Sequence, residues 1–207
     1  SAQALATGRA LGDMHRALAD FGGHRDNSLT LPGWHALAAK CGDAGFAAID
    51  PALATLVAGE LTWLDAHWPS DLPRSVIHAD LFPDNVLMLD DRVTGLIDFY
   101  FACHDIRAYD LVITHAAWCF SADGRHFNAA LSEALLAGYA DSHGLSEAER
   151  AALPILARGA CLRFLLTRAY DWINTPADAL VMRKDPMAFV RRLQFYTEAG
   201  ADAFIGA

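Results

Sequence analysis

A short stretch of β-type sequence, residues 75–100, interrupts a chain that otherwise has the pattern of helices. Two brief apolar runs in it, 76–78 and 86–89, have the length and side chains of strands, and a third run follows at 94–99. The segment 79–85 between the first two runs is polar and contains a proline, which is typical of a loop. Loops held by a rigid scaffold often carry functional side chains. The pattern predicts a mainly α protein with a small β insert, an α+β fold.

Apolar residues recur at helical spacing on both sides of this insert. Ser146 and Glu149 form an S-x-x-E capping box, which predicts the start of a helix. Pro154 is interpreted as the first residue of a separate helix that follows it. The helices expected from periodicity and end signals are 3–20, 34–40, 51–68, 108–119, 126–142, 147–152, 154–172 and 186–199.

Composition restricts the classes of protein to which the chain can belong. With 207 residues, 54% hydrophobic and 20% charged, it can form an ordinary domain with a proper core and is not a disordered segment. A net charge of −9 without a long basic run argues against binding to nucleic acid. The chain shows no membrane-spanning apolar run and no signal peptide, and its four cysteines form no CxxC pair. We therefore expect a cytoplasmic protein with reduced thiols.

The polar loop carries the run His78-Ala79-Asp80-Leu81-Phe82-Pro83-Asp84-Asn85, whose core is H-x-D-x-x-x-x-N. A further carboxylate, Asp98, stands near the end of the third predicted strand, thirteen residues after Asn85. Phosphoryl transfer needs such groups in this order. Asp80 would orient the attacking hydroxyl and accept its proton, while Asn85 and Asp98 would supply hard oxygen ligands for magnesium. Because the loop returns Asn85 beside the strand that ends at Asp98, we expect both side chains to reach one ion.

Two other interpretations of the same residues remain open. Asp and Asn are common in polar turns, so His78, Asp80 and Asn85 would only cap the loop. Alternatively, His78 and Asp80 would be metal ligands by themselves, although no other His or Cys stands close enough in sequence to complete a zinc site. The carboxylate at residue 98, on a strand expected to pair with the first two, favours the phosphotransfer interpretation.

These motifs resemble those of the kinases that act on aminoglycosides, choline and related small alcohols, which are relatives of the protein-kinase fold. Within that group, the motifs outside the shared catalytic loop resemble the homoserine kinases of the threonine pathway. The likeness extends over nearly the whole chain. The segments that carry it are 76–86, 95–102, 108–111, 117–120, 158–168, 170–172 and 184–186.

The resemblance implies a kinase that uses ATP and Mg²⁺, with L-homoserine as the expected substrate. Carried over residue by residue, it implies that Asp80 is the catalytic base and that Asn85 and Asp98 are the magnesium ligands. It also implies that His78, next to the base in the catalytic motif, and Asp110 support the catalytic loop. In such kinases a smaller N-terminal β-lobe holds the ATP phosphates with a glycine-rich loop and a strand lysine.

No such glycine-rich loop or lysine-bearing strand is found in 1–74. The chain therefore corresponds to the C-terminal lobe of a protein-kinase-like fold with the N-terminal β-lobe absent, and alone it is expected neither to bind ATP tightly nor to turn over. We interpret 1–207 as a single domain in which 1–74 is helical, 75–100 holds the catalytic loop and metal-binding strands, and 101–207 is helical and binds substrate. The surface near 75–100 would be exposed and partly apolar, which favours a homodimer.

Homoserine offers a carboxylate, an ammonium and a hydroxyl group, and the predicted helix around 155–173 carries groups that match them. Arg163 is expected to bind the carboxylate, because a guanidinium can hold it at two points. Tyr170 shares the helix face of Arg163 and is a further substrate-binding candidate. Asp171 either accepts the ammonium or forms a surface ion pair with Arg168 at i, i+3 spacing.

His104 and Asp105 follow the metal-binding strand closely and are expected to face the same pocket. A choline, ethanolamine or aminoglycoside kinase would share the catalytic loop and is the alternative within the same class. A choline site would want several aromatic side chains and would not need Arg163. The alternative of another class is a non-catalytic kinase-like scaffold, which has no chemical need for the reactive residue types at 80, 85 and 98.

Overall fold

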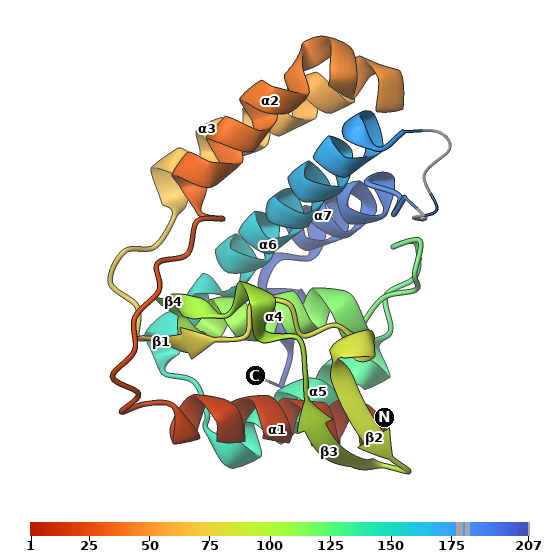
Figure 1. Cartoon of the computed structure of the whole chain (residues 1–207). Coiled ribbons are helices and arrows are strands. Elements are labelled where there is room, and N and C mark those ends of the chain that lie inside the picture. Colours follow the sequence, from red (N-terminus) through yellow and green to blue (C-terminus); the bar gives the residue numbers. More distant parts are fainter. Residues whose placement is uncertain (177–179, 181–182, 207) are drawn as a thin grey trace.

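The computed structural model describes residues 1–176, 180 and 183–206, and it is mostly helical with two small antiparallel sheets (Figure 1). This confirms the expected fold class. The helices are α1 (Ala2–Ala17), α2 (Leu31–Ile49), α3 (Leu53–His67), α4 (Arg107–Trp118), α5 (Ala129–Ser142), α6 (Glu147–Asn174) and α7 (Met187–Ala199). The strands are β1 (Arg74–Ile77), β2 (Val86–Leu89), β3 (Arg92–Leu96) and β4 (Cys103–Ile106). Short 3₁₀ helices cover Pro83–Asn85, Phe99–Phe101 and Gly200–Phe204.

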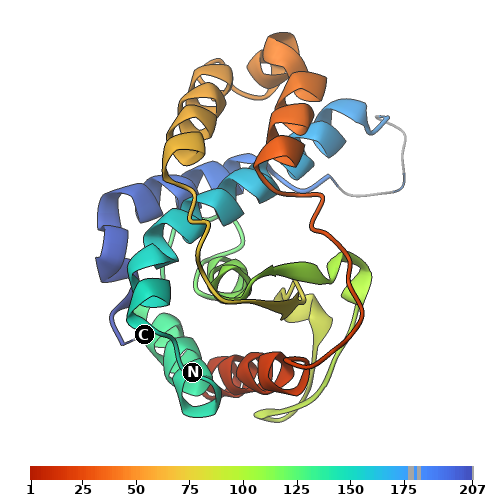
Figure 2. The same cartoon turned by 90° about the vertical axis from the view of Figure 1, so that its left-hand side faces the viewer.

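The helices form two groups with α4 between them. Helices α2, α3, α6 and α7 lie together at one end of the molecule, and α1 and α5 lie side by side at the other, in both views (Figures 1 and 2). Nearly every residue of α4 is buried, so this helix is the centre of the core. The β1–β4 sheet lies alongside α4, and the β2–β3 hairpin lies beside α1 (Figure 1).

Helices α1 and α5 approach each other closely because glycines stand at their crossing. A Cβ atom at Gly8 would come within 2.0 Å of the Leu135 oxygen, and one at Gly138 would come within 2.0 Å of the Leu5 oxygen. Only glycine allows two helix backbones to come so near. The close crossing fixes α1 against the body of the fold, where its last turns reach α4.

The strand pairing differs from the expectation in one respect. Strands β2 and β3 pair as expected, with Val86 opposite Leu96. Strand β1 does not join them; it pairs with β4, with Ile77 opposite Cys103. Strand β4 lies in the part of the chain expected to be wholly helical. It is only four residues long, and its side chains do not alternate cleanly between buried and exposed, so periodicity gives little signal for it.

The helix ends also differ from the expectation at two places. Helix α6 is continuous from Glu147 to Asn174, so the two helices expected on either side of Pro154 are one. Proline removes one backbone donor near the start of this helix. The capping box of Ser146 and Glu149 and the many buried apolar side chains after Pro154 stabilise the helix in spite of this loss. Helix α2 runs well beyond the expected 34–40, through a kink at Gly42, whose φ is 65°.

Two further observations concern the chain as a whole. No helix in the described part of the chain has both the length and the apolar character needed to cross a membrane. The four cysteines, Cys41, Cys103, Cys119 and Cys161, are free and buried. Burial raises the pKa of the Cys41 thiol to about 11, and a protonated thiol is a poor nucleophile.

Candidate active site

The two sheets bring three segments of the chain together at one place. Asp80 lies on the loop that leaves β1, and Asn85 lies at the end of the 3₁₀ turn that leads into β2. Asp98 follows β3 by two residues. Because β2 pairs with β3, the backbone N–H of Ile97 donates to the backbone oxygen of Asn85 at 3.0 Å, and this bond fixes Asn85 next to Asp98. The pairing of β2 with β3 therefore brings together Asn85 and Asp98, which are thirteen residues apart in the sequence.

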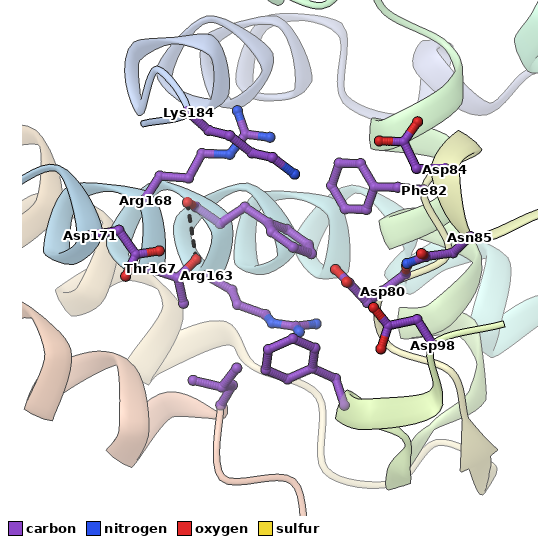
Figure 3. A pocket seen from close by; sticks show the side chains of 13 residues that line it. Asp80, Phe82, Asp84, Asn85, Asp98, Arg163, Thr167, Arg168, Asp171 and Lys184 are labelled. Atoms are coloured by element: carbon purple, nitrogen blue, oxygen red, sulfur yellow. Dashed lines mark hydrogen bonds between the residues drawn. The ribbon is translucent and has the colours of Figure 1, made fainter. Parts of the chain in front are cut away.

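Asp80, Asn85 and Asp98 line a single pocket of about 300 Å³. Their side chains lie close together at one side of it (Figure 3). The amide nitrogen of Asn85 donates to the backbone oxygen of Asp80 at 2.7 Å, and this leaves the amide oxygen free to bind another group. Asp98 has a left-handed backbone conformation, with φ 62° and ψ 58°. Non-glycine residues rarely adopt it, and such strain is concentrated at functional sites.

His78 is buried behind this pocket and connects its two walls. Its Nε2 donates to the Ile97 oxygen at 2.9 Å, and its Nδ1 accepts from the Asp80 backbone N–H at 3.3 Å. One nitrogen must donate and the other must accept, so the ring is the neutral tautomer protonated at Nε2. His78 is not among the side chains that line the pocket. In this arrangement it holds the backbone of the loop.

Asp110, on α4, holds the backbone of the same loop. Its carboxylate is fully buried and accepts from the backbone N–H groups of His78 at 2.7 Å and Ala79 at 2.8 Å. Ala79 has a φ of 63°, another left-handed conformation, which these bonds stabilise. The carboxylate also accepts from His15 Nε2 of α1 at 3.0 Å. Burial alone would raise the pKa of Asp110, but the hydrogen bonds from the His15 side chain and from the His78 backbone hold it below its ordinary value.

The carboxylate of Asp80 points into the pocket and accepts no hydrogen bond from any residue that the structure describes. Burial raises the pKa of Asp80 above its ordinary value, while the positive charges of Arg163 and Lys184 act in the opposite direction. A carboxylate that is partly desolvated and unpaired is a better proton acceptor than one in water. The geometry thus leaves Asp80 available for a ligand.

The opposite wall of the pocket comes mainly from α6. Arg163, Thr167, Arg168 and Asp171 line it, and Lys184 joins them from the segment that precedes α7 (Figure 3). Of these, the sequence suggested Arg163 and Asp171 as substrate-binding residues, and both are in the pocket wall. The structure does not show the ion pair considered for Arg168 and Asp171; Arg168 instead donates to the Asp185 oxygen at 3.2 Å.

The other three substrate-binding candidates lie outside this pocket. Tyr170 packs against the apolar core, because its position on α6 is turned away from that of Asp171. His104 lines a different cavity, on the other side of the β1–β4 sheet, where its ring lies 5.0 Å from that of His24. Asp105 is buried and accepts from Asn27 Nδ2 at 2.7 Å. Its partners are residues of the protein, so its role in this structure is to hold the fold.

Sequence reasoning missed Arg168 and Lys184 as pocket residues. Arg168 stands three residues before Asp171, which was a substrate-binding candidate, and residues at i, i+3 are neighbours on a helix surface, so this spacing was a usable signal. Lys184 has no such signal, because nothing in its local sequence shows that the segment before α7 returns to α6. Only the packing of α7 on α6 places it there.

Solved structures with this fold include small-molecule kinases. A choline/ethanolamine kinase family protein from Mesorhizobium loti matches 97% of this chain and 66% of its own length, with a TM-score of 0.66 at 21% identity. The choline kinase from Cryptosporidium parvum matches 98% of this chain and 67% of its own length, with a TM-score of 0.66 at 13% identity. At such identities the match shows a shared fold, of the protein-kinase-like kind, and nothing about substrate.

Similarity in sequence is much stronger to other proteins. The chain is 55% identical over 201 residues to homoserine kinase from Zymomonas mobilis subsp. mobilis, and 50% identical over 199 residues to homoserine kinase from Rhizobium rhizogenes. These matches cover 97% and 96% of this chain but 62% and 61% of the relatives, so the chain spans about three fifths of their length. Residues 1–153, well over half of the chain, match the phosphotransferase enzyme family. The chain belongs to the phosphotransferase enzyme family.

Proposed function

We propose that the chain forms the catalytic and magnesium-binding part of a kinase that transfers the γ-phosphoryl group of ATP to the hydroxyl of L-homoserine. The observation that carries the proposal is the presence of Asp80, Asn85 and Asp98 in one pocket. Residues that only capped a polar turn would have no reason to converge with a side chain from another strand. Relatives 55% and 50% identical to the chain, which are homoserine kinases, support the choice of substrate.

In this proposal Asp80 is the catalytic base. The hydroxyl oxygen of the substrate forms a bond to the γ-phosphorus while the bond from that phosphorus to the β–γ bridging oxygen breaks. The hydroxyl proton passes to the Asp80 carboxylate, and ADP leaves with the electron pair of the broken bond. The transition state is loose, so the proton is transferred late and a carboxylate is a strong enough base. His78 and Asp110 act indirectly, because they hold the backbone on which Asp80 stands.

Asn85 and Asp98 fit Mg²⁺ as ligands. One amide oxygen and one carboxylate are the few hard donors that Mg²⁺ takes from protein, with phosphate oxygens and water completing its octahedron. No group of three or more His, Cys, Asp or Glu side chains able to hold a metal occurs in the described part of the chain, so a cage made wholly of protein ligands is not expected there. Bound at this position, Mg²⁺ supplies neutralisation of the phosphate charge.

The pocket wall opposite Asp80 argues against two alternatives, a choline kinase and a non-catalytic kinase-like scaffold. Three cationic side chains, Arg163, Arg168 and Lys184, would repel the quaternary ammonium of choline, and Arg168 and Lys184 suit an anionic group. A non-catalytic scaffold gives no account of a free carboxylate in a partly desolvated pocket. We place the activity in the cytoplasm, where ATP is abundant and buried free cysteines such as those of this chain stay reduced.

The test is the change Asp80→Asn in the complete product of the gene, assayed for ATP-dependent phosphorylation of L-homoserine. Loss of the base should lower kcat by a factor on the order of 10²–10⁴. Asp90→Asn is a matched control, because Asp90 lies in the exposed turn after β2 and its left-handed backbone, φ 55°, accepts asparagine. Equal activity of the Asp80→Asn variant and the unchanged protein would remove Asp80 from the mechanism.

A further inference from the structure

Two cations and one carboxylate line the wall of the pocket opposite Asp80. Arg168 and Asp171 come from successive turns of α6, and Lys184 comes from the segment before α7 (Figure 3). Residues at i, i+3 on a helix have Cβ atoms about 5–6 Å apart, so Arg168 and Asp171 start from neighbouring points of α6. From there the guanidinium of Arg168 extends toward Lys184, and the carboxylate of Asp171 lies beside Thr167 (Figure 3). The α-carbon of an amino acid presents the matching pair, a carboxylate and an ammonium on one atom.

Arg163 is unsuited to bind the substrate carboxylate, although it lines the pocket. Its side chain is 2% exposed, and one guanidinium nitrogen donates to the backbone oxygen of Ala79. The guanidinium carbon also lies 4.6 Å from the centre of the Phe164 ring and 5.4 Å from that of Phe101, so two rings cover it. Arg163 therefore helps to hold the left-handed Ala79 in place and has the role of a positioning residue.

Arg168 and Lys184 carry positive charges that the protein does not neutralise. Arg168 lies over the ring of Phe189 at 4.5 Å and donates only to a backbone oxygen, that of Asp185. Lys184 lies 5.9 Å from the centre of the Phe82 ring, and neither cation forms an ion pair with a carboxylate of the described residues. Burial, and then the charge of Arg192, lower the pKa of Arg168 to about 10. A bound anion would stabilise the charged guanidinium and so raise the pKa of Arg168 again.

Asp171 offers the complementary group. Its carboxylate lines the pocket and has no hydrogen-bond or ion-pair partner in the part of the chain that the structure describes. Figure 3 shows it beside Thr167, on the same side of the pocket as Arg168. An ammonium bound there would lie next to a carboxylate bound by Arg168, and the rest of the ligand would extend toward Asp80.

We propose that Arg168 and Lys184 bind the α-carboxylate of the substrate, and that Asp171 binds its α-ammonium. The substrate class is then an α-amino acid whose side-chain hydroxyl reaches Asp80. This inference rests on the proposed kinase function and adds to it the groups by which the substrate is recognised. Amino alcohols without a carboxylate meet two cations with no anion between them, and are poor substrates for that reason.

The experiment compares three ligands in the complete product of the gene: L-homoserine, 3-aminopropan-1-ol, which lacks the carboxylate, and 4-hydroxybutanoate, which lacks the ammonium. Arg168→Gln and Lys184→Gln should each lower kcat/KM for homoserine about ten- to hundredfold, mainly through KM, because each removes a charged hydrogen bond. Neither change should weaken 3-aminopropan-1-ol, measured as a substrate or as a competitor of homoserine. Asp171→Asn should weaken homoserine to a similar degree and leave 4-hydroxybutanoate unaffected.

Two controls separate recognition from damage to the site. Arg163→Gln should lower kcat for every ligand that is turned over, because it disturbs the catalytic loop and not one end of the substrate. Arg9→Gln, on the exposed face of α1, should change nothing. If Arg168→Gln weakens homoserine and 3-aminopropan-1-ol equally, the carboxylate assignment is wrong while the kinase function stands. If the unchanged protein phosphorylates no homoserine, the function itself fails and this inference fails with it.

Discussion

The side-chain amide of Asn85 donates a 2.7 Å hydrogen bond to the backbone oxygen of Asp80, five residues earlier in the chain. This bond closes the catalytic loop on itself. It sets the position of the proposed base and leaves the amide oxygen of Asn85 free, at the side of the pocket where Asp98 also lies (Figure 3). One side chain thus positions both the base and a proposed magnesium ligand.

We predict that Asn85→Ala makes the activity depend on much more magnesium. The change removes one proposed ligand and the bond that shapes the loop, so the half-saturating Mg²⁺ concentration should rise by at least about tenfold. Initial rates of homoserine phosphorylation across a range of Mg²⁺ concentrations measure it. Asn174→Ala is the control, because that amide also donates to a backbone oxygen, of Tyr170 at 2.7 Å, but lies at the exposed end of α6. The same magnesium dependence in both variants would contradict the role of Asn85.

We predict that Asp80→Asn makes the protein more stable at neutral pH while inactivating it. Burial raises the pKa of Asp80, so the folded protein holds this proton more tightly than the unfolded chain does. Ionised Asp80 therefore lowers stability above the unfolded pKa of about 3.9, and that loss grows as the pH rises through the folded pKa. The urea midpoint of the variant should exceed that of the unchanged protein at pH 7, and the gain should shrink toward pH 4. A lower midpoint at pH 7 would show that Asp80 stabilises the fold.

The glycines at the crossing of α1 and α5 give a prediction about stability alone. Gly8→Ala places a Cβ 2.0 Å from the Leu135 oxygen, and we expect the overlap to lower the unfolding free energy by about 1–3 kcal/mol. Gly59→Ala, in the open middle of α3, should raise it by about 0.5–1 kcal/mol, because no atom lies within 4 Å and alanine favours helix. Urea unfolding of both variants tests the pair. Equal effects of the two changes would mean that α1 and α5 do not touch in solution.

We predict that the chain of 207 residues self-associates. Six large apolar side chains between Leu87 and Phe101 are more than a third exposed on and beside the β2–β3 sheet, and a patch of this kind tends to be covered by another molecule. Sedimentation at several protein concentrations should give the mass of a dimer, and Leu89→Glu with Tyr100→Ser should shift it to that of a monomer. A monomer mass at every concentration of the unchanged chain would refute the prediction.

The polar loop 79–85 and its approach to Asp98 were predictable from sequence, because the residue types and their order form one pattern; their catalytic roles stay predictions. His78, Asp80 and Asn85 stand within one short run, and the strand before Asp98 was recognisable from its apolar residues. Long periodic helices such as α1, α3 and α5 were also predictable to within a few residues, since their apolar stripes and caps are strong local signals. In these segments the local sequence signals and the folded structure agree.

The parts that were not predictable depend on contacts between distant segments. Strand β4 exists because residues 103–106 find β1, and four residues give no period of their own. Pro154 stays inside α6 because packing along a long helix outweighs one lost backbone bond. Lys184 enters the pocket only through the return of the chain before α7. Such features are decided by tertiary packing and not by local preference.

The hydrogen bond from His15 to Asp110 connects α1 to the loop that carries Asp80, because the same carboxylate binds the backbone of that loop. Asp110 accepts from the amides of His78 and Ala79 and from His15 of α1, so we expect those amides to exchange with solvent faster when α1 undocks. Helix α1 and the loop should therefore open as one cooperative unit, although sixty residues separate them in the chain. Whatever lifts the N-terminal helix, whether heat, denaturant or a binding protein, would loosen the backbone that carries Asp80 at the same moment.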